Sequence, residues 1–165
     1  MFSTEFAKKL LLLPKVVRDG TTAVNLLAEK SRYILVSKEE SEYEFLFEIT
    51  SHKKISLKVS LHHQENNSRE GLLRVDYKGG HKNPENVTDF VPEIVKPYVG
   101  YFFQNEPHIH VFVEGFRNLA WAIPLSEYAF SVLDIQNTAD YGNAVQAFAK
   151  EINIVSPLTI QHVLL

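Results

Sequence analysis

Hydrophobic and polar residues alternate through much of the first half of the chain. Apolar side chains take every second position in three stretches, at residues 43–49, 55–61 and 71–77. A repeat of two residues is the pattern of a β-strand that buries one face and exposes the other. A further strand is predicted at 32–36, and a short hairpin over 50–53 joins the first two stretches. The core is expected to include Phe45, Phe47, Leu57 and Val59.

A second pair of strands is predicted later in the chain, at residues 108–114 and 119–124. On the first of them one side carries His108, His110, Phe112 and Glu114, and the other carries Ile109, Val111 and Val113. β-branched residues favour a packed sheet surface, so their side is expected to be the core. The histidine side then faces a cleft, the solvent or a second layer. Trp121, on the second strand, is expected in the core.

Two helices are predicted, one near each end of the chain. Residues 3–13 begin at a capping residue, Ser3 or Thr4, and residues 138–152 carry an apolar stripe at helical spacing. Strands combined with such helices are typical of α+β folds, and 165 residues suit one domain, 1–165. We predict an α+β fold: an antiparallel, strongly curved sheet of about five to seven strands, with a short N-terminal helix and a C-terminal helix packed on it.

The remaining segments are polar or interrupted by proline. Residues 63–70 are expected to form a polar loop, with His62 and His63 solvated at a strand end. Residues 81–106 form a long connection, and a connection of this length is usually functional or contains structure of its own. A short helix is expected within 126–132. Ser156 and Pro157 resemble a cap and a first helical residue.

Composition narrows the classes of function. The formal net charge is −3, which provides no overall basic field for nucleic acid. The chain contains no cysteine, so thiol catalysis, cysteine-bound zinc and disulfides are excluded. No secretory signal pattern is present at the N-terminus, and the longest apolar run there, Leu10 to Leu13, is far too short to span a membrane. We expect a cytoplasmic protein without membrane contact.

Two further residues share a face with each other on the predicted strand 71–77, namely Arg74 and Asp76. If this strand neighbours the histidine strand, one site gathers six residues: Arg74, Asp76, His81, His108, His110 and Glu114. That site has two chemical interpretations. One divalent metal could be held by His108, His110 and Glu114. Without a metal, a histidine could act as general acid or base, oriented by Asp76, while Arg74 binds a phosphate. A third interpretation is structural: the histidines bond to neighbours while Arg74 and Asp76 pair.

Five short motifs stand in order along the chain: R-x-D at 74–76, H-x-N-P at 81–84, H-x-H at 108–110, E-G at 114–115 and W-A-x-P-L at 121–125. Together with the leading helix they resemble a small, uncharacterised family of bacterial and mobile-element proteins, a domain of unknown function. The resemblance implies a bacterial or phage context and one small domain, but no activity. Its motif residues coincide with those that strand alternation places on the polar face.

Two classes of function follow. The first is a non-enzymatic interaction protein without a cofactor, for example an inhibitor in a phage–host conflict that acts on a nucleic-acid-processing defence complex. Its contact with a protein partner, or with a second copy of the chain, would use four aromatic residues of the long connection: Phe90, Tyr98, Tyr101 and Phe102. The alternative is a small toxin-like RNase or a metal-dependent hydrolase that uses the His/Asp cluster. Only that alternative requires nucleic acid.

Overall fold

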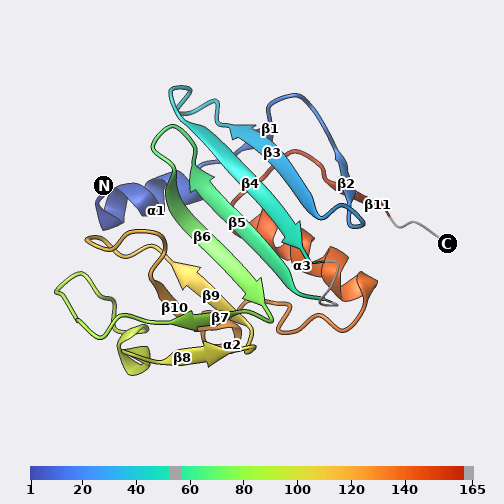
Figure 1. Cartoon of the computed structure of the whole chain (residues 1–165). Coiled ribbons are helices and arrows are strands. Elements are labelled where there is room, and N and C mark those ends of the chain that lie inside the picture. Colours follow the sequence, from blue (N-terminus) through green and yellow to red (C-terminus); the bar gives the residue numbers. More distant parts are fainter. Residues whose placement is uncertain (53–56, 162–165) are drawn as a thin grey trace.

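The main element of the structure, a computed structural model that describes residues 1–52 and 57–161, is an open seven-stranded antiparallel sheet (Figure 1). Its strands, in spatial order, are β1 (Val16–Val17), β3 (Lys30–Val36), β4 (Glu44–Ser51), β5 (Val59–Glu65), β6 (Glu70–Tyr77), β9 (His108–Val111) and β10 (Trp121–Pro124). Consecutive strands from β3 to β6 pair directly with their neighbours in sequence. The long connection after β6 is bypassed, and β9 pairs with β6.

Two small sheets complete the strand set of the described residues. β2 (Ala23–Asn25) pairs in parallel with β11 (Thr159–Gln161), which joins the segment after α3 to the segment between β1 and β3. β7 (Gly80–Lys82) pairs antiparallel with β8 (Phe102–Gln104). The segment between β7 and β8 contains one short 3-10 helix, η1 (Lys96–Tyr98). The connection predicted at 81–106 therefore has structure of its own.

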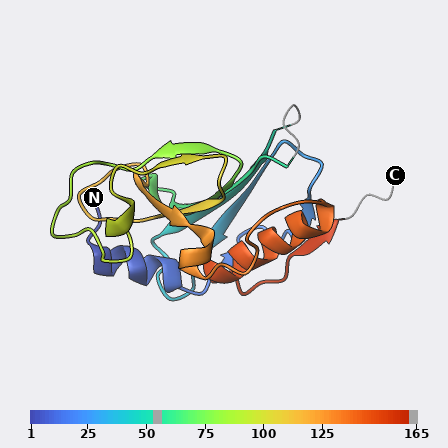
Figure 2. The ribbon, with the colours of Figure 1, turned by 90° about the horizontal axis from the view of Figure 1, so that it is seen from below.

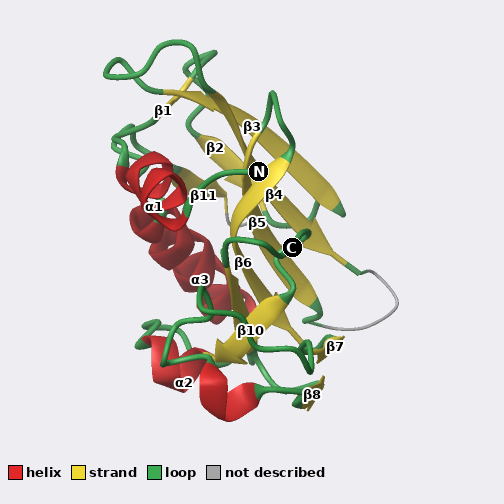
Figure 3. Cartoon of the chain, turned by 90° about the vertical axis from the view of Figure 1, so that its left-hand side faces the viewer, coloured by secondary structure: helices red, strands yellow, loops and turns green. Residues whose placement is uncertain are grey.

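Three helices lie on one face of the main sheet, and the β7–β8 pair lies on the opposite face (Figures 2 and 3). α1 (Thr4–Leu12) begins at Ser3, whose hydroxyl accepts the amide N–H of Phe6. α3 (Thr138–Glu151) begins at Asn137, whose side chain accepts the amide N–H of Asp140. Between them in sequence lies the single-turn α2 (Leu125–Tyr128). Among residues 1–52 and 57–161, no helix is long and apolar enough to cross a bilayer.

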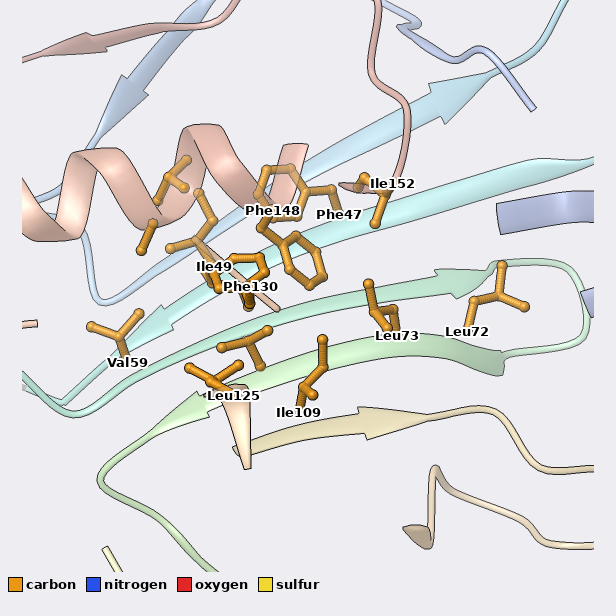
Figure 4. Packing of buried hydrophobic residues seen from close by; sticks show 14 of the residues in the cluster. Phe47, Ile49, Val59, Leu72, Leu73, Ile109, Leu125, Phe130, Phe148 and Ile152 are labelled. Atoms are coloured by element: carbon orange, nitrogen blue, oxygen red, sulfur yellow. The ribbon is translucent and has the colours of Figure 1, made fainter. Parts of the chain in front are cut away.

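The hydrophobic core fills the space between the sheet and the helices. Phe148 of α3 is fully buried and stacks on Phe47 of β4, with ring centroids 5.4 Å apart (Figure 4). The predicted core is confirmed at five of its positions: Phe45, Phe47, Val59, Ile109 and Val113. Leu57 and Val111 are half-buried and pack against the core edge. Trp121 is fully buried, as predicted.

The α+β class and the antiparallel sheet are confirmed, as are the N-terminal helix and a C-terminal helix over the sheet. The strong curvature of the sheet stays a prediction. The short helix expected within 126–132 occurs one residue earlier, at 125–128. The segment after Pro157 forms strand β11 rather than a helix, because it pairs with β2. Part of the predicted hairpin and strand, residues 53–56, lies outside the described residues.

One prediction about the histidines is wrong. β5 continues to Glu65, so residues 63–65 belong to the sheet and not to a loop. His63 lies on the core face with no solvent exposure, stacks on Phe45 and donates its Nδ1–H to the carbonyl oxygen of Leu46 at 3.0 Å. The polar composition of the segment hid this, because a buried imidazole with a backbone acceptor can occupy a core position. His62, on the other face, is half-buried and contacts Gln64.

Candidate functional site

The register of β6 and β9 brings the predicted site residues together. Arg74 lies directly opposite His110, and Asp76 lies directly opposite His108. These four side chains are on the face of the sheet that points away from the helices, because the alternate residues of the same strands, such as Val75 and Ile109, fill the core. Strand alternation and strand pairing together therefore produce one cluster.

Asp76 is the centre of this cluster. Its Oδ2 lies 3.0 Å from Nε2 of His110 and 3.6 Å from Nε2 of His108. Arg74 donates from Nε to Oδ1 at 3.0 Å, and its second nitrogen, NH2, lies 2.8 Å from Oδ2. Burial raises the pKa of the Asp76 carboxyl, but its contacts with the two histidines and the charge of Arg74 outweigh burial. The net result is a pKa well below the ordinary range, so Asp76 is an anion.

Both histidines are held by backbone carbonyls on the side away from Asp76. Nδ1 of His108 lies 2.7 Å from the carbonyl oxygen of Glu106, and Nδ1 of His110 lies 2.8 Å from that of Leu119. A carbonyl oxygen only accepts hydrogen bonds, so each Nδ1 carries a proton. Each Nε2 is thereby directed toward Asp76. Nε2 of His108 is buried and has no hydrogen-bond partner among the described residues.

The cluster is closed off from solvent. The relative exposure is 5% for Asp76, 0% for His108 and 3% for His110. Phe103 of β8 is itself fully buried and stacks on His108, with ring centroids 4.8 Å apart. Only the Arg74 side chain reaches solvent to a substantial degree. The histidine face of β9 is therefore covered by a second layer, which was one of the three environments expected for it.

His81 of β7 belongs to the same cluster, as predicted from its position after β6. Its ring lies 4.5 Å from the His110 ring and 6.1 Å from the His108 ring, measured between centroids. Its Nε2 bonds to the carbonyl oxygen of Ala120 at 2.8 Å. Burial lowers the pKa of His81, and the neighbouring His110 lowers it further. A neutral ring is therefore favoured near pH 7.

The structure places Glu114 away from the histidines. Its Oε2 accepts the amide N–H of Thr4 at 2.8 Å, in the first turn of α1. β9 ends at Val111, and the amide of Phe116 donates to the carbonyl oxygen of Val113, so Glu114 lies in a turn and not in a strand whose alternation would bring it onto the histidine face. The carboxylate that joins His108 and His110 is Asp76, and these three residues form a potential metal-ligand set.

The covering layer consists of β7, β8 and the segment between them, and Asn83 fixes this layer to the main sheet. Its Oδ1 accepts the amide N–H of Ala122 at 2.8 Å, and its Nδ2 donates to the carbonyl oxygens of Ala122 at 2.8 Å and Tyr98 at 2.9 Å. Ala122 lies on β10, the edge strand, so Asn83 satisfies backbone groups that an edge leaves unpaired. Sequence reasoning assigned no role to Asn83 or to Phe103. The H-x-N-P motif was the available signal for Asn83.

The four aromatic residues proposed for partner binding lie on or beside the covering layer. Phe90, Tyr101 and Phe102 are exposed, with relative exposures of 53%, 40% and 56%. Tyr98 is half-buried, packs against the core and lies edge-on to Tyr101, with ring centroids 5.7 Å apart. The same segment also buries Val91, Val95 and Phe103. Buried side chains therefore hold the segment against the rest of the protein, while aromatic rings remain exposed on its outer side.

Comparison with known protein families gives one match, to a family of unknown function, and it covers residues 2–154. Neither the curated proteins nor the solved structures contain a significant match. The family match includes every residue of the cluster and of its cover, from Arg74 to Ala122. This chain belongs to DUF6978, a family of unknown function.

Proposed function

We propose that the protein is a non-enzymatic interaction protein, whose contact surface is the outer side of residues 87–102. One observation carries the proposal. Among the described residues, six of the eleven large hydrophobic side chains that are exposed fall within this segment: Val87, Phe90, Ile94, Val99, Tyr101 and Phe102. Exposed apolar residues concentrated on one segment mark an interaction surface more than scattered ones do.

The segment is suited to binding because it is preorganised. Val91 and Val95 insert into the core, and Asn83 bonds to the backbone of Tyr98. The amide of Gly100 donates to the carbonyl oxygen of Pro84, which closes the base of the segment. A surface whose backbone is already ordered loses less conformational entropy when it binds.

The charges near the surface favour a protein over a nucleic acid. Glu93 pairs with Lys96 of the segment, and Glu85 pairs with Lys82 just before it, so both of these lysines are compensated. Asp89 adds a further exposed negative charge beside Phe90. A polyphosphate would meet no basic field here. A protein with an apolar groove bordered by basic residues is the complementary partner.

A bacterial or phage origin and an inhibitory role in phage–host conflict are parts of this proposal that rest on the resemblance of the motifs. A cytoplasmic location is a further part, and it rests on the lack of cysteine. Glu39 and Glu42 add some support, because both are exposed next to the start of β4 and would suit the basic channel of a nucleic-acid-processing complex. Glu40 and Glu44 support it less, since they pair with Lys9 and Arg18.

The hydrolase alternative is favoured by one observation, the convergence of Asp76, His108 and His110. The burial of all three side chains under β8 opposes it, because a scissile bond must reach the catalytic groups. The alternative therefore requires the covering layer to open. A folded His108→Ala/His110→Ala variant that cleaves RNA as the wild type does, with and without chelator, removes it.

The proposal is tested by affinity capture from the cells in which the protein naturally occurs, followed by quantitative mass spectrometry. Three tagged baits are compared: wild type, Phe90→Ser/Phe102→Ser, and a control, Leu27→Ser/Leu133→Ser, which removes two exposed apolar side chains elsewhere. We expect a protein that wild type and control retain equally and that the surface variant loses at least about tenfold, equivalent to about 1.4 kcal/mol. Equal recovery with all three baits contradicts the proposal.

Self-association is measured in parallel by sedimentation of the three purified proteins. A dimer that only the surface variant loses identifies a second copy of the chain as the partner. A monomer in all three cases, together with equal recovery in the capture experiment, removes the surface from consideration.

A further inference from the structure

We propose that Asp76, His108 and His110 bind one divalent transition-metal ion, with zinc as the best match. The three donor atoms, one carboxylate oxygen and two imidazole nitrogens, all lie within 4.8 Å of one another. They come from two neighbouring strands, which hold them at fixed separation. Two imidazoles and one carboxylate form a donor set that zinc and other borderline metals accept.

The distances suit one central ion. In a tetrahedral zinc site with bonds of about 2.0–2.1 Å, neighbouring ligand atoms are separated by roughly 3.3–3.5 Å. The two separations from Asp76 Oδ2 are 3.0 Å to His110 and 3.6 Å to His108, so they lie on either side of this range. Small rotations of the two rings would bring all three atoms to bonding distance.

The hydrogen bonds that hold the three donor side chains from behind are an independent observation. Metal-bound histidines usually donate their other ring N–H to a carbonyl or a carboxylate, which fixes the ring and directs the free nitrogen. Both histidines have this arrangement through Glu106 O and Leu119 O. Asp76 is supported in the same way by Arg74, whose Nε bonds to Oδ1 and whose NH2 lies 2.8 Å from Oδ2, so one of the two lone pairs of Oδ2 remains for the metal.

The unpaired nitrogen of His108 points to a missing ligand. His108 is fully buried, and within the described part of the chain its Nε2 has no hydrogen-bond partner, although it faces Asp76. A buried polar atom without a partner costs free energy comparable to a lost hydrogen bond. An ion pair between Asp76 and His110 alone leaves that nitrogen unused, whereas a metal ion gives all three donors a common partner.

The burial of the donors makes this a structural site. Phe103 covers His108, and the Arg74 side chain borders the only exposed margin of the four-residue cluster. A bound ion would join β6 to β9 beneath the covering layer. The fourth position of a tetrahedral shell would be taken by one water that enters at the Arg74 margin. This inference is independent of the proposed partner surface, because metal binding is measured on the isolated protein.

The test begins with wild-type protein treated with chelator and then titrated with Co²⁺, a zinc substitute with a visible spectrum. We expect one Co²⁺ per chain, the intense absorption of a tetrahedral site, and displacement by Zn²⁺. His108→Gln should weaken binding by about 100-fold or more. His62→Gln, which removes an imidazole on the same sheet face outside the donor set, should bind as wild type does.

If His108→Gln does not fold, X-ray absorption spectroscopy of the zinc-loaded wild type identifies the ligands of the metal instead. Two imidazole nitrogens and at least one oxygen around zinc support the site. A stoichiometry other than one, binding that His108→Gln leaves unchanged, or a zinc shell without two imidazoles overturns it. None of these results affects the capture experiment, so the two proposals fail separately.

Discussion

His110 and Asp76 meet diagonally across β9 and β6, with Nε2 of the histidine 3.0 Å from Oδ2 of the carboxylate. Neither residue is the direct cross-strand partner of the other, since His110 lies opposite Arg74 and Asp76 lies opposite His108. With the diagonal contact the carboxylate has three basic neighbours: Arg74, His108 and His110. This contact makes Asp76 the residue on which the electrostatic balance of the cluster depends.

Replacing Asp76 with Asn is therefore expected to destabilise the fold. The change removes the only anion among these neighbours and leaves Arg74 without its ion-pair partner. We expect a loss of about 1–3 kcal/mol, below the scale for a fully buried ion pair, because the Arg74 side chain that loses its partner is partly exposed. Urea denaturation measures it. Asp89→Asn, at an exposed position, serves as the control, and equal midpoints for the two variants would show that the diagonal contact contributes nothing.

Asn83→Ala is expected to release the covering layer. The substitution removes three hydrogen bonds, two of them to the backbone of Ala122, and leaves those buried groups unpaired. We expect the free energy of unfolding to fall by about 1–3 kcal/mol. Relative to wild type, amide hydrogen exchange should become faster in β7 and β8 and stay unchanged in β4. The control is Asn86→Ala, an exposed asparagine three residues away. Unchanged exchange in β7 and β8 would mean that the clamp is not needed.

Phe148→Ala is expected to destabilise the protein by about 3–5 kcal/mol, because a fully buried aromatic side chain leaves a cavity. The stacked contact with Phe47 is lost at the same time. Thermal and urea unfolding measure the effect. Leu133→Ala, which removes an exposed side chain, should stay within about 0.5 kcal/mol of wild type. A Phe148→Ala midpoint equal to that of the control would contradict the packing described for α3.

His63 is expected to make the protein sensitive to mild acid. Burial holds the pKa of His63 well below its ordinary value, while the unfolded chain protonates it near pH 6.5. The unfolded state therefore binds more protons, and stability falls as pH drops below about 6.5. Burial also lowers the pKa of Lys15, to about 7. By about pH 6 and below, Lys15 is charged in both states, so it adds little slope there.

The measurement is the free energy of unfolding between pH 6.5 and 5, in wild type and in His63→Gln. Removing the imidazole should reduce the slope by up to about 1.4 kcal/mol per pH unit. Burial lowers the pKa of His62 and of His81 too, so part of the slope should remain. The exposed His52→Gln is the control. A slope that is the same in all three proteins would show that His63 is not held neutral.

Much of the sheet could be predicted because its strands bury one face. Phe45, Phe47 and Val59 follow a repeat of two, and burial on one side gives that repeat a clear meaning. The cluster followed from the same reasoning, since Arg74 and Asp76 share one side of their strand, and His108 and His110 share one side of theirs. The pairing of β6 with β9, which brings these residues together, is a tertiary property. From the sequence alone, the two strands could only be assumed to be neighbours.

The rest depends on contacts between distant segments. β9 is buried on both faces, because β8 covers the histidines, and a pattern of alternating residues cannot reveal a second covering layer. Strands β7 and β8 are only three residues long and lie on either side of a segment with prolines, so neither has a detectable repeat. His63 entered the core against its polarity through one backbone acceptor. Glu114 left the predicted site through a turn at Gly115.

The proposed contact surface is tested most directly by site-specific photocrosslinking in living cells. A photoreactive phenylalanine analogue is placed at Phe102, within the surface, or at Leu27, an exposed position elsewhere. We predict that Phe102 yields a crosslink to one protein and that Leu27 yields none to that protein. The same crosslinked product from both positions, or no product from Phe102 while the substituted protein is folded, would contradict the proposed function.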